Sequence, residues 1–283
     1  MTVDTTNKTK VVLTKGSSSA EIFLFGATLT SWIVGGKELI FLSRKAKLDG
    51  TKAIRGGVPI VFPQFGTVED SSLPQHGFAR NSFWTWLGII SDTADEVQVK
   101  FGLNQSNIDP QLGKLWEHTK DFELQLTVTL NDNKKTLAMK INVQNTGNND
   151  NFKFTALLHT YFKINDITKV EIFGLKNSMY HDKVLKKSGL LEGNEALKID
   201  KETDRVYSLN ENSIGFNFNE GKIVIKKFGF SDVVVWNPWI EKARSMADFD
   251  DEEYKEMVCV EVGAVSKSVS VSSTNSFEAV QEL

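Results

Sequence analysis

The segment from residue 55 to residue 84 gathers side chains that can bind an anion. It contains Arg55, His76, Arg80 and three of the chain's five prolines, but no lysine, although the chain has 28 lysines and only 5 arginines. Arg offers a planar fork of donors that matches phosphate or carboxylate, whereas Lys is a mobile point charge. One arginine in a surface loop would mean little. Two arginines in a stiff, proline-rich loop predict a local anion site.

Two ionisable residues lie inside apolar strand patterns. His159 falls in FKFTALLHTYFK (152–163), and Glu261 falls in MVCVEVGAV (257–265), where alternation puts it on one face with Cys259 and Gly263. A carboxylate in an apolar strand is costly unless it is paired or used. Taken alone, His159 could be a core residue and Glu261 a solvated residue of an edge strand. Together they indicate an acid–base site.

Further polar candidates come late in the chain. The stretch WNPWIEKARSMADF (236–249) has two tryptophans, Trp236 and Trp239, followed by Lys242 and Arg244. Indole rings have an apolar body and a polar N–H, and their faces commonly stack on sugars, although Trp is also a frequent core residue. Asp204, in ETDRVY, is another candidate, with an ordinary turn acid as the alternative.

Metal and nucleotide motifs are absent from the sequence. Its four histidines have no HxH or HExxH spacing, there is a single cysteine, and Gly56-Gly57 lacks the spacing of a phosphate-binding glycine loop. We therefore expect no metal site and no phosphate-binding glycine loop. The histidines are His76, His118, His159 and His181.

The composition of the chain limits the kinds of partner that it is expected to bind and the compartment in which it is expected to work. The net charge is −3 with both signs interspersed, which suggests neither nucleic acid nor an anionic membrane as a partner. The lone Cys259 fits a reducing compartment, and no apolar run approaches the roughly 20 residues of a membrane span. The N-terminus lacks the build of a secretory signal. We expect a cytoplasmic monomer that binds a small molecule.

The dominant apolar period is two residues. In 121–144, apolar residues alternate with polar ones on both sides of Asn131-Asp132-Asn133, which predicts a β-hairpin. One short helix is expected at 248–257, loops at 175–203, and a single domain over 1–283. So many strands with so little helix favour a large antiparallel sandwich or barrel. Other strands are expected at 10–15, 20–25, 28–34, 38–42, 83–90, 96–103, 152–162, 168–174, 213–218, 222–228, 232–236, 258–263 and 267–272.

These segments, in this order, resemble the aldose 1-epimerase (galactose mutarotase-like) family, and within it the glucose-6-phosphate 1-epimerase branch. The resemblance covers residues 20–272. Single pieces such as RGG or HG are weak signals, but several of them in the same order are strong. The pieces are RGGVP and FPQFG from residue 55, LPQHGFARNSFW, HTYF from residue 159, ETDRVY, WNPWIEKARSMADF and YKEMVCVEVG.

The resemblance implies an all-β supersandwich and a cofactor-free hexose-6-phosphate mutarotase, which interconverts α and β anomers. In that case His159 would be the general acid at the ring oxygen and Glu261 the general base at the anomeric hydroxyl. The implied ligands of the 6-phosphate are Arg55 and Arg80, assisted by Lys242 or Arg244, and those of the rest of the sugar are Gln75, His76 and Asp204.

Mutarotation needs one base and one acid. We expect Glu261 and His159 to stabilise each other's charge, which would lower the pKa of the carboxyl and raise that of the imidazole. Two other classes of protein remain open. A non-catalytic carbohydrate-binding β-sandwich needs no interior acid–base pair, and a glycoside hydrolase needs a second carboxylate about 5–10 Å away, which we cannot nominate.

Overall fold

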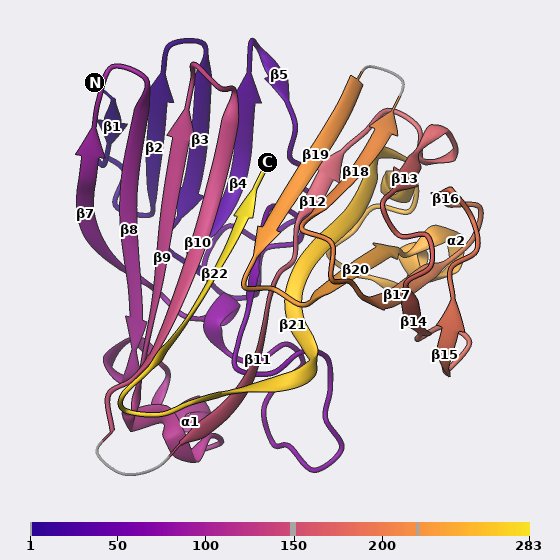
Figure 1. The fold of residues 1–283 in the computed structure, drawn as a ribbon. Coiled ribbons are helices and arrows are strands. Elements are labelled where there is room, and N and C mark those ends of the chain that lie inside the picture. The colour runs from indigo at the N-terminus through magenta and orange to yellow at the C-terminus, as the bar shows by residue number, and fades with distance from the viewer. Residues whose placement is uncertain (1, 148–150, 219–220) are drawn as a thin grey trace.

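A computed structural model describes residues 2–147, 151–218 and 221–283. The chain folds into three sheets, and in the described part of the chain every pairing between named strands is antiparallel (Figure 1). The predicted all-β, antiparallel class is confirmed. The described residues contain two short α-helices, α1 (Pro110–Gly113) and α2 (Trp239–Ser245). Neither is long and apolar enough to cross a membrane.

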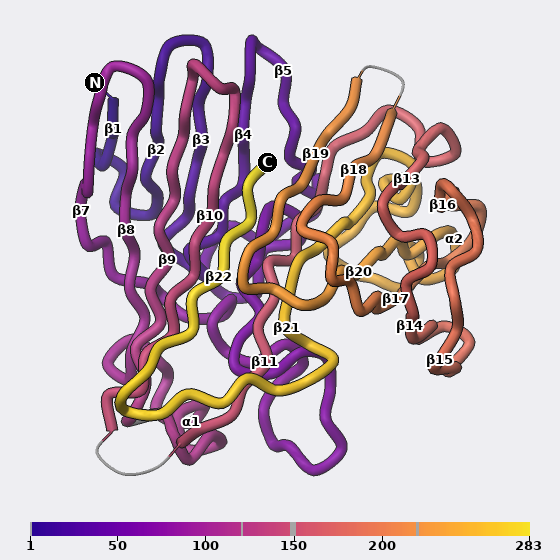
Figure 2. Tube along the Cα trace, viewed as in Figure 1, coloured from indigo at the N-terminus to yellow at the C-terminus, as the bar shows by residue number. Residues whose placement is uncertain are grey.

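The first sheet is a simple meander of five strands. Its order follows the chain, with β3 and β4 as the long central hairpin. Strands β2 and β3 pack against β8 and β9 of the second sheet, so the two sheets form the layers of a sandwich (Figures 1 and 2). The strands are β1 (Val3–Asp4), β2 (Lys10–Lys15), β3 (Ser18–Phe23), β4 (Thr28–Val34) and β5 (Lys37–Glu38).

The second sheet has nine strands and contains the predicted hairpin as β9 and β10. Leu124, Leu126 and Leu130 of β9 are fully buried, as the alternation requires. The strand order is β16 (Ala196–Lys198), β13 (Glu171–Phe173), β18 (Ser213–Phe218), β19 (Gly221–Phe228), β22 (Ser276–Glu282), β10 (Thr136–Asn145), β9 (Phe122–Asn131), β8 (Glu96–Asn104) and β7 (Thr85–Asp92).

The third sheet has eight strands and carries Asp204 on β17 and Glu261 on β21, with His159 in the break between β11 and β12. The strand β21 runs through its middle, between β20 and β11, and also pairs with the short β12. The order is β15 (Lys187–Leu191), β14 (Met179–Asp182), β17 (Thr203–Ser208), β20 (Asp232–Asn237), β21 (Met257–Val271), β11 (Phe152–Leu158) and β6 (Ile60–Val61), with β12 (Tyr161–Lys163) beside it.

Several predicted elements differ in the structure. The expected helix at 248–257 is a turn followed by a 3-10 helix at Glu253–Glu256 and the start of β21, whereas the helix that forms is α2. The acidic run is held as a turn because the buried carboxylate of Glu253 accepts hydrogen bonds from Ser43, Arg44 and Asp250. The segment 175–203, expected as loops, forms β14, β15 and β16.

Three other strand boundaries differ from the prediction. The expected strand at 152–162 is interrupted at 159–160, between β11 and β12, while the two strands expected at 258–263 and 267–272 are the single strand β21. The strand expected at 38–42 is reduced to Lys37–Glu38, followed by isolated bridges at Ile40 and Leu42.

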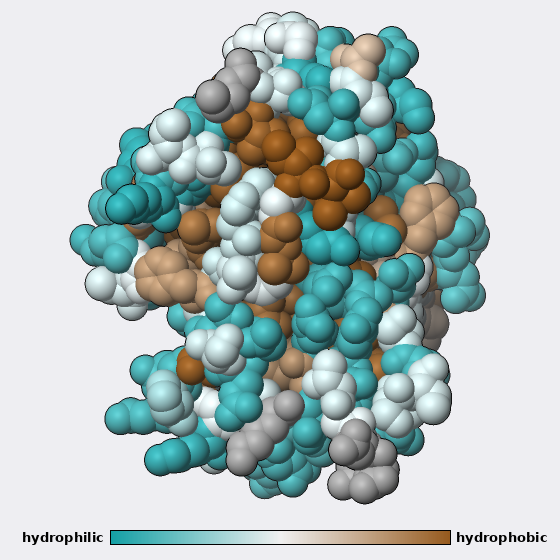
Figure 3. Space-filling model, turned by 90° about the vertical axis from the view of Figure 1, so that its left-hand side faces the viewer, coloured by the Kyte–Doolittle hydropathy of each residue, from teal (hydrophilic) through white to brown (hydrophobic). Residues whose placement is uncertain are grey.

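Strand β7 closes one edge of the nine-stranded sheet and carries exposed apolar side chains. Leu87, Ile89 and Ile90 are each about half exposed. Apolar surface is gathered on this side of the molecule (Figure 3). Irregularities between Trp86 and Gly88 and between Ile89 and Ser91 shift the register of β7 against β8. Such bulges twist an edge strand and make it a poor template for pairing with another chain.

Candidate active site

Eight of the nine predicted site residues line one cavity of about 250 Å³ on the face of the eight-stranded sheet. The exception is Arg244, which is exposed on α2 and pairs with Glu241 at 3.5 Å instead of lining the cavity. Of the two alternatives offered for assisting the phosphate, the cavity lining contains Lys242, and the side chain of Arg244 is exposed to solvent. The eight are Arg55, Gln75, His76, Arg80, His159, Asp204, Lys242 and Glu261.

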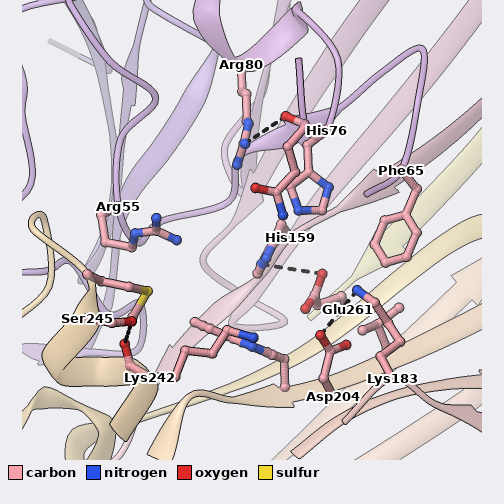
Figure 4. Close-up of a pocket in the computed structure, with 14 residues that line it drawn as sticks. Arg55, Phe65, His76, Arg80, His159, Lys183, Asp204, Lys242, Ser245 and Glu261 are labelled. Atoms are coloured by element: carbon pink, nitrogen blue, oxygen red, sulfur yellow. Dashed lines mark hydrogen bonds and ion pairs between the residues drawn. The ribbon is translucent and has the colours of Figure 1, made fainter. Parts of the chain in front are cut away.

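His159 and Glu261 face each other at the floor of the cavity. His159 lies in the break between β11 and β12, where its backbone N–H donates to the Pro59 carbonyl at 3.0 Å. Glu261 lies opposite Val234 in the centre of β21. The Nδ1 of His159 and the Oε2 of Glu261 are 3.4 Å apart, and the imidazole stacks on the Tyr161 ring with centroids 4.7 Å apart. Both predicted interior residues therefore belong to one site (Figure 4).

Burial moves the pKa values of this pair in the direction opposite to the one expected from mutual stabilisation. Glu261 is 1% exposed, and burial, reinforced by the nearby Asp204, raises the pKa of its carboxyl well above 4.5. Burial, together with His76, Arg80, Arg55 and Lys183, lowers the pKa of the His159 imidazole well below 6.5. Desolvation disfavours both charged forms and outweighs their attraction. Burial therefore favours the neutral form of each group of this pair.

Arg55 is fixed in place before any ligand arrives. Its Nε donates to Asp248 at 3.2 Å and its Nη1 to the hydroxyl of Tyr161 at 3.1 Å. Gly57, two residues further along the chain, has φ +72°, and a Cβ there would lie 2.3 Å from the Leu29 carbonyl oxygen. Glycine is therefore required for the loop to pack against β4 and present Arg55 to the cavity.

The hydrogen-bond donors of Arg80 are less fully used than those of Arg55. It lies in the 3-10 helix Ala79–Asn81, and its Nη2 donates to the Gln75 carbonyl at 2.9 Å. Its Nε is buried and has no hydrogen-bond partner among the described residues. Burial lowers the pKa of its guanidinium to about 10, so it is still charged at neutral pH. Arg55 and Arg80 lie on one side of His159, opposite the carboxyl groups (Figure 4).

His76 presents a neutral ring to the cavity. Its Nδ1 accepts from the Gly66 backbone N–H at 3.1 Å, which leaves the proton of the neutral ring on Nε2. Burial lowers the pKa of the imidazole well below 6.5. The ring meets that of His159 edge-on, with centroids 5.8 Å apart. Its backbone has φ +67°, and the turn continues at Gly77, so this ring position is set by an unusual local conformation.

Lys183 was not identified from the sequence, yet it lines the cavity. It follows β14, in the stretch expected to be loops, and its backbone N–H donates to the Asp204 carbonyl at 2.8 Å. Its ammonium lies 3.2 Å from the carboxylate of Asp204 and 4.9 Å from the centre of the Phe65 ring. Lys183 lowers the pKa of Glu261, acting against burial. No sequence signal pointed to it, because one Lys in a Lys-rich segment looks like solvated surface.

The tryptophan cluster divides between the cavity and the core. Trp236, on β20, lines the cavity and meets His159 edge-on at 5.9 Å. Trp239 packs instead against Tyr254, with centroids 5.2 Å apart. Asn237 holds this corner together, because its side-chain amide donates to the backbone carbonyls of Tyr254 and Met257 at 2.8 and 3.0 Å.

Among the residues that the structure describes, one group of side chains could hold a metal ion. Ligand atoms of His159, Cys259 and Glu261 lie within 4.8 Å of one another. Burial and the neighbouring Glu261 raise the pKa of the Cys259 thiol well above its ordinary value, so it remains protonated. Because metals bind the thiolate, this donor set is poorly prepared for one. The arrangement instead suits proton exchange with a bound polar ligand.

The comparisons with known proteins agree with this geometry. The profile of the family described as aldose 1-epimerase matches residues 9–283. The chain belongs to the aldose 1-epimerase family. It is therefore an enzyme of the sugar epimerase and mutarotase class.

Two curated relatives carry the provisional name glucose-6-phosphate 1-epimerase. One, from Cenchrus ciliaris, is 40% identical over 272 residues, which is 93% of this chain and 80% of the relative. The other, from Escherichia coli, is 36% identical over 267 residues, covering 92% of this chain and 85% of the relative.

Solved structures share the architecture. A protein from Salmonella typhimurium, provisionally described as a mutarotase, superposes with a TM-score of 0.85 at 29% identity, covering 96% of this chain and 88% of the other. Galactose 1-epimerase from Lactobacillus acidophilus has the same fold, with a TM-score of 0.70 at 13% identity and coverage of 96% and 92%.

Proposed function

We propose that this protein interconverts the α and β anomers of glucose 6-phosphate and related hexose 6-phosphates. The observation that carries the proposal is that Arg55 and Arg80 line the same cavity as the facing pair His159 and Glu261. An acid–base pair alone would suit any aldose. Two arginines on one side of it, one with unused donors, suit a sugar that carries a phosphate.

The reaction requires one proton transfer between the sugar and each member of this pair, and the breaking and re-forming of one C–O bond. Glu261 removes the proton of the C1 hydroxyl while His159 gives a proton to the ring oxygen, and the bond between C1 and the ring oxygen breaks. The open-chain aldehyde then rotates about the C1–C2 bond. Closure with the other face exposed reverses both transfers. A positioned acid or base contributes typically about 10²–10⁴-fold each.

The neutral forms that burial favours are compatible with this cycle. A protonated carboxyl with a neutral imidazole carries one proton, and the working state with a carboxylate and an imidazolium carries the same number. Moving one proton from Oε2 to Nδ1 converts one state into the other; the two atoms are 3.4 Å apart, and neither has a hydrogen-bond partner among the described residues, so the transfer requires a closer approach of the two groups. No proton has to enter from solvent.

The remaining residues of the cavity would orient the sugar. His76 offers an Nε2–H donor, and the Asp204 carboxylate offers acceptors for ring hydroxyls. Trp236 presents its ring near His159, and Lys242 lies at the rim with its ammonium 3.1 Å from Glu202.

Exchange spectroscopy on glucose 6-phosphate tests the proposal. Two-dimensional proton NMR at anomeric equilibrium measures the rate at which the H1 signals of the two anomers exchange, so slow spontaneous mutarotation is subtracted directly. We expect catalytic amounts of the protein to raise this rate far above buffer, and far more than with glucose at equal concentration. Equal rates for both sugars would refute the phosphate selectivity. Background rates for both would refute the function.

A further inference from the structure

The cavity holds more positive charge than its carboxylates balance. Four cationic side chains line it, from Arg55, Arg80, Lys183 and Lys242. Three of them lie about 3.2 Å or less from a carboxylate oxygen. Arg80 has no carboxylate within ion-pair distance in the described ranges, and its recorded contact is the neutral Gln75 carbonyl. The carboxylate partners of the other three are Asp248, Asp204 and Glu202 respectively.

This excess charge acts on the proposed acid. His159 is faced by the edge of His76 at 5.8 Å and by the guanidinium groups of Arg80 and Arg55, and Lys183 acts on it from the far side of the cavity. Tyr161 and Trp236, which also pack against the ring, are neutral. Across from it are the carboxyl of Glu261 at 3.4 Å and, beyond that, Asp204, which is already paired with Lys183. These cations therefore disfavour the imidazolium form of His159 when no anion is bound.

We propose that an anion held by Arg80 and Arg55 is a switch that allows His159 to carry the catalytic proton. This inference rests on the proposed function and extends it, because the phosphate of the substrate then acts in the chemical step as well as in binding. A dianion beside the two guanidinium groups offsets their field at His159 and gives Arg80 the partner it lacks. The proton of the pair can then move from Glu261 to Nδ1 of His159.

The switch implies a further activity. A free anion in the same place should activate the enzyme towards a sugar without a phosphate, because the electrostatic effect does not depend on a covalent link. Inorganic phosphate should therefore accelerate mutarotation of glucose. An opposite charge close to a titrating group typically changes its protonation equilibrium by tenfold or more. We expect a rise of roughly tenfold or more in the rate for glucose at saturating phosphate.

The first experiment measures glucose exchange by NMR with increasing inorganic phosphate, against potassium chloride at equal ionic strength. The wild-type protein and Arg244→Met, whose changed side chain is exposed and outside the cavity, should both be activated by phosphate. Arg80→Met should not. If phosphate leaves the glucose rate flat in the wild-type protein, or only inhibits it, while glucose 6-phosphate is turned over, the switch is wrong and the proposed function stands.

The second experiment needs no turnover. The pKa of the His159 ring is measured by NMR of the imidazole nitrogens, assigned from the signal lost in His159→Asn, with and without inorganic phosphate. We expect phosphate to raise this pKa in the wild-type protein and not in Arg80→Met. A raised pKa in a protein that fails to turn over glucose 6-phosphate would support the switch and reject the function. An unchanged pKa in the wild-type protein rejects the switch.

Discussion

Replacing Arg80 with Met removes a guanidinium but keeps an apolar stem of similar length. Of its donors, Nη2 donates to the Gln75 carbonyl at 2.9 Å, and Nε is buried with no hydrogen-bond partner in the described part of the chain. A bound phosphate would therefore lose one or two charge-assisted hydrogen bonds. At about 1.5–3 kcal/mol each, we expect a loss of about 1.5–6 kcal/mol, or roughly 10- to 25,000-fold in kcat/KM for glucose 6-phosphate.

In Arg80→Met we expect the thermal stability of the folded protein to be kept or raised, although the activity falls. The pKa of Arg80 is lowered to about 10 because burial disfavours its charge in the folded protein. Removing a buried charge with no carboxylate partner is often neutral or stabilising. We expect the Tm of the empty Arg80→Met protein to equal or exceed that of the wild type. The rise in Tm that phosphate produces in the wild type should disappear, because a ligand stabilises only the protein that binds it.

The assay is the anomer exchange rate at several concentrations of glucose 6-phosphate and of glucose, alongside thermal unfolding with and without phosphate. Arg244→Met is the matched control, since it removes an exposed arginine outside the cavity. The reasoning would be refuted by equal losses of activity towards both sugars. A markedly lower Tm with the phosphate response intact would likewise show that Arg80 is a structural residue.

Three further predictions follow from individual contacts. Glu261→Gln should gain stability over wild type by about 1.4 kcal/mol per pH unit above 4.5, until the raised pKa of the folded carboxyl is reached, as measured by urea unfolding across pH. Lys183→Met should lose about tenfold in kcat/KM at pH 6 and much less at pH 9, because Lys183 lowers the pKa of Glu261. The control is Lys187→Met, which changes an exposed residue of β15 and should match the wild type. Gly77→Ala should unfold at least about 2 kcal/mol more easily, because φ is +71° and its Cβ would lie 2.2 Å from the Phe62 carbonyl oxygen.

A different experimental result would contradict each of these three predictions. For Glu261→Gln, the sign follows from the raised pKa: the contribution of the wild-type carboxyl is fully present below its ordinary pKa and is lost as pH rises towards its folded pKa. A stability difference that shrinks with rising pH would contradict it. For Lys183→Met, a uniform loss at all pH values, or no rescue by Lys183→Arg, would point to misfolding. For Gly77→Ala, wild-type stability would mean that the loop can move.

Much of the fold could be predicted because one face of most strands is buried. Alternation in 121–144 is sufficient to predict β9 and β10, and the same rule puts Glu261 on one face with Cys259. Alternation fails where side chains on both faces are exposed. In β15, for example, the adjacent Lys187 and Ser188 lie on opposite faces and are both exposed, so no pattern marked the strand.

The site was predictable as a set of unusual residues but not as an arrangement. Glu261 is identifiable because a carboxylate in an apolar strand needs a reason. The support of Arg55 by Asp248 spans 193 residues of sequence, and no local pattern encodes it. The direction of the pKa shifts was also beyond the sequence, because it depends on how deeply His159 is buried and on the cations that face it.

The central claim is that His159 and Glu261 together turn over the anomers of glucose 6-phosphate. Saturation transfer between the two H1 signals, measured with equal amounts of wild type, Glu261→Gln and His159→Asn, tests it most directly. Circular dichroism is recorded on each to show that it is folded. We expect rapid exchange with the wild type and exchange at the buffer rate with both variants. Near-wild-type exchange in either folded variant would contradict the account.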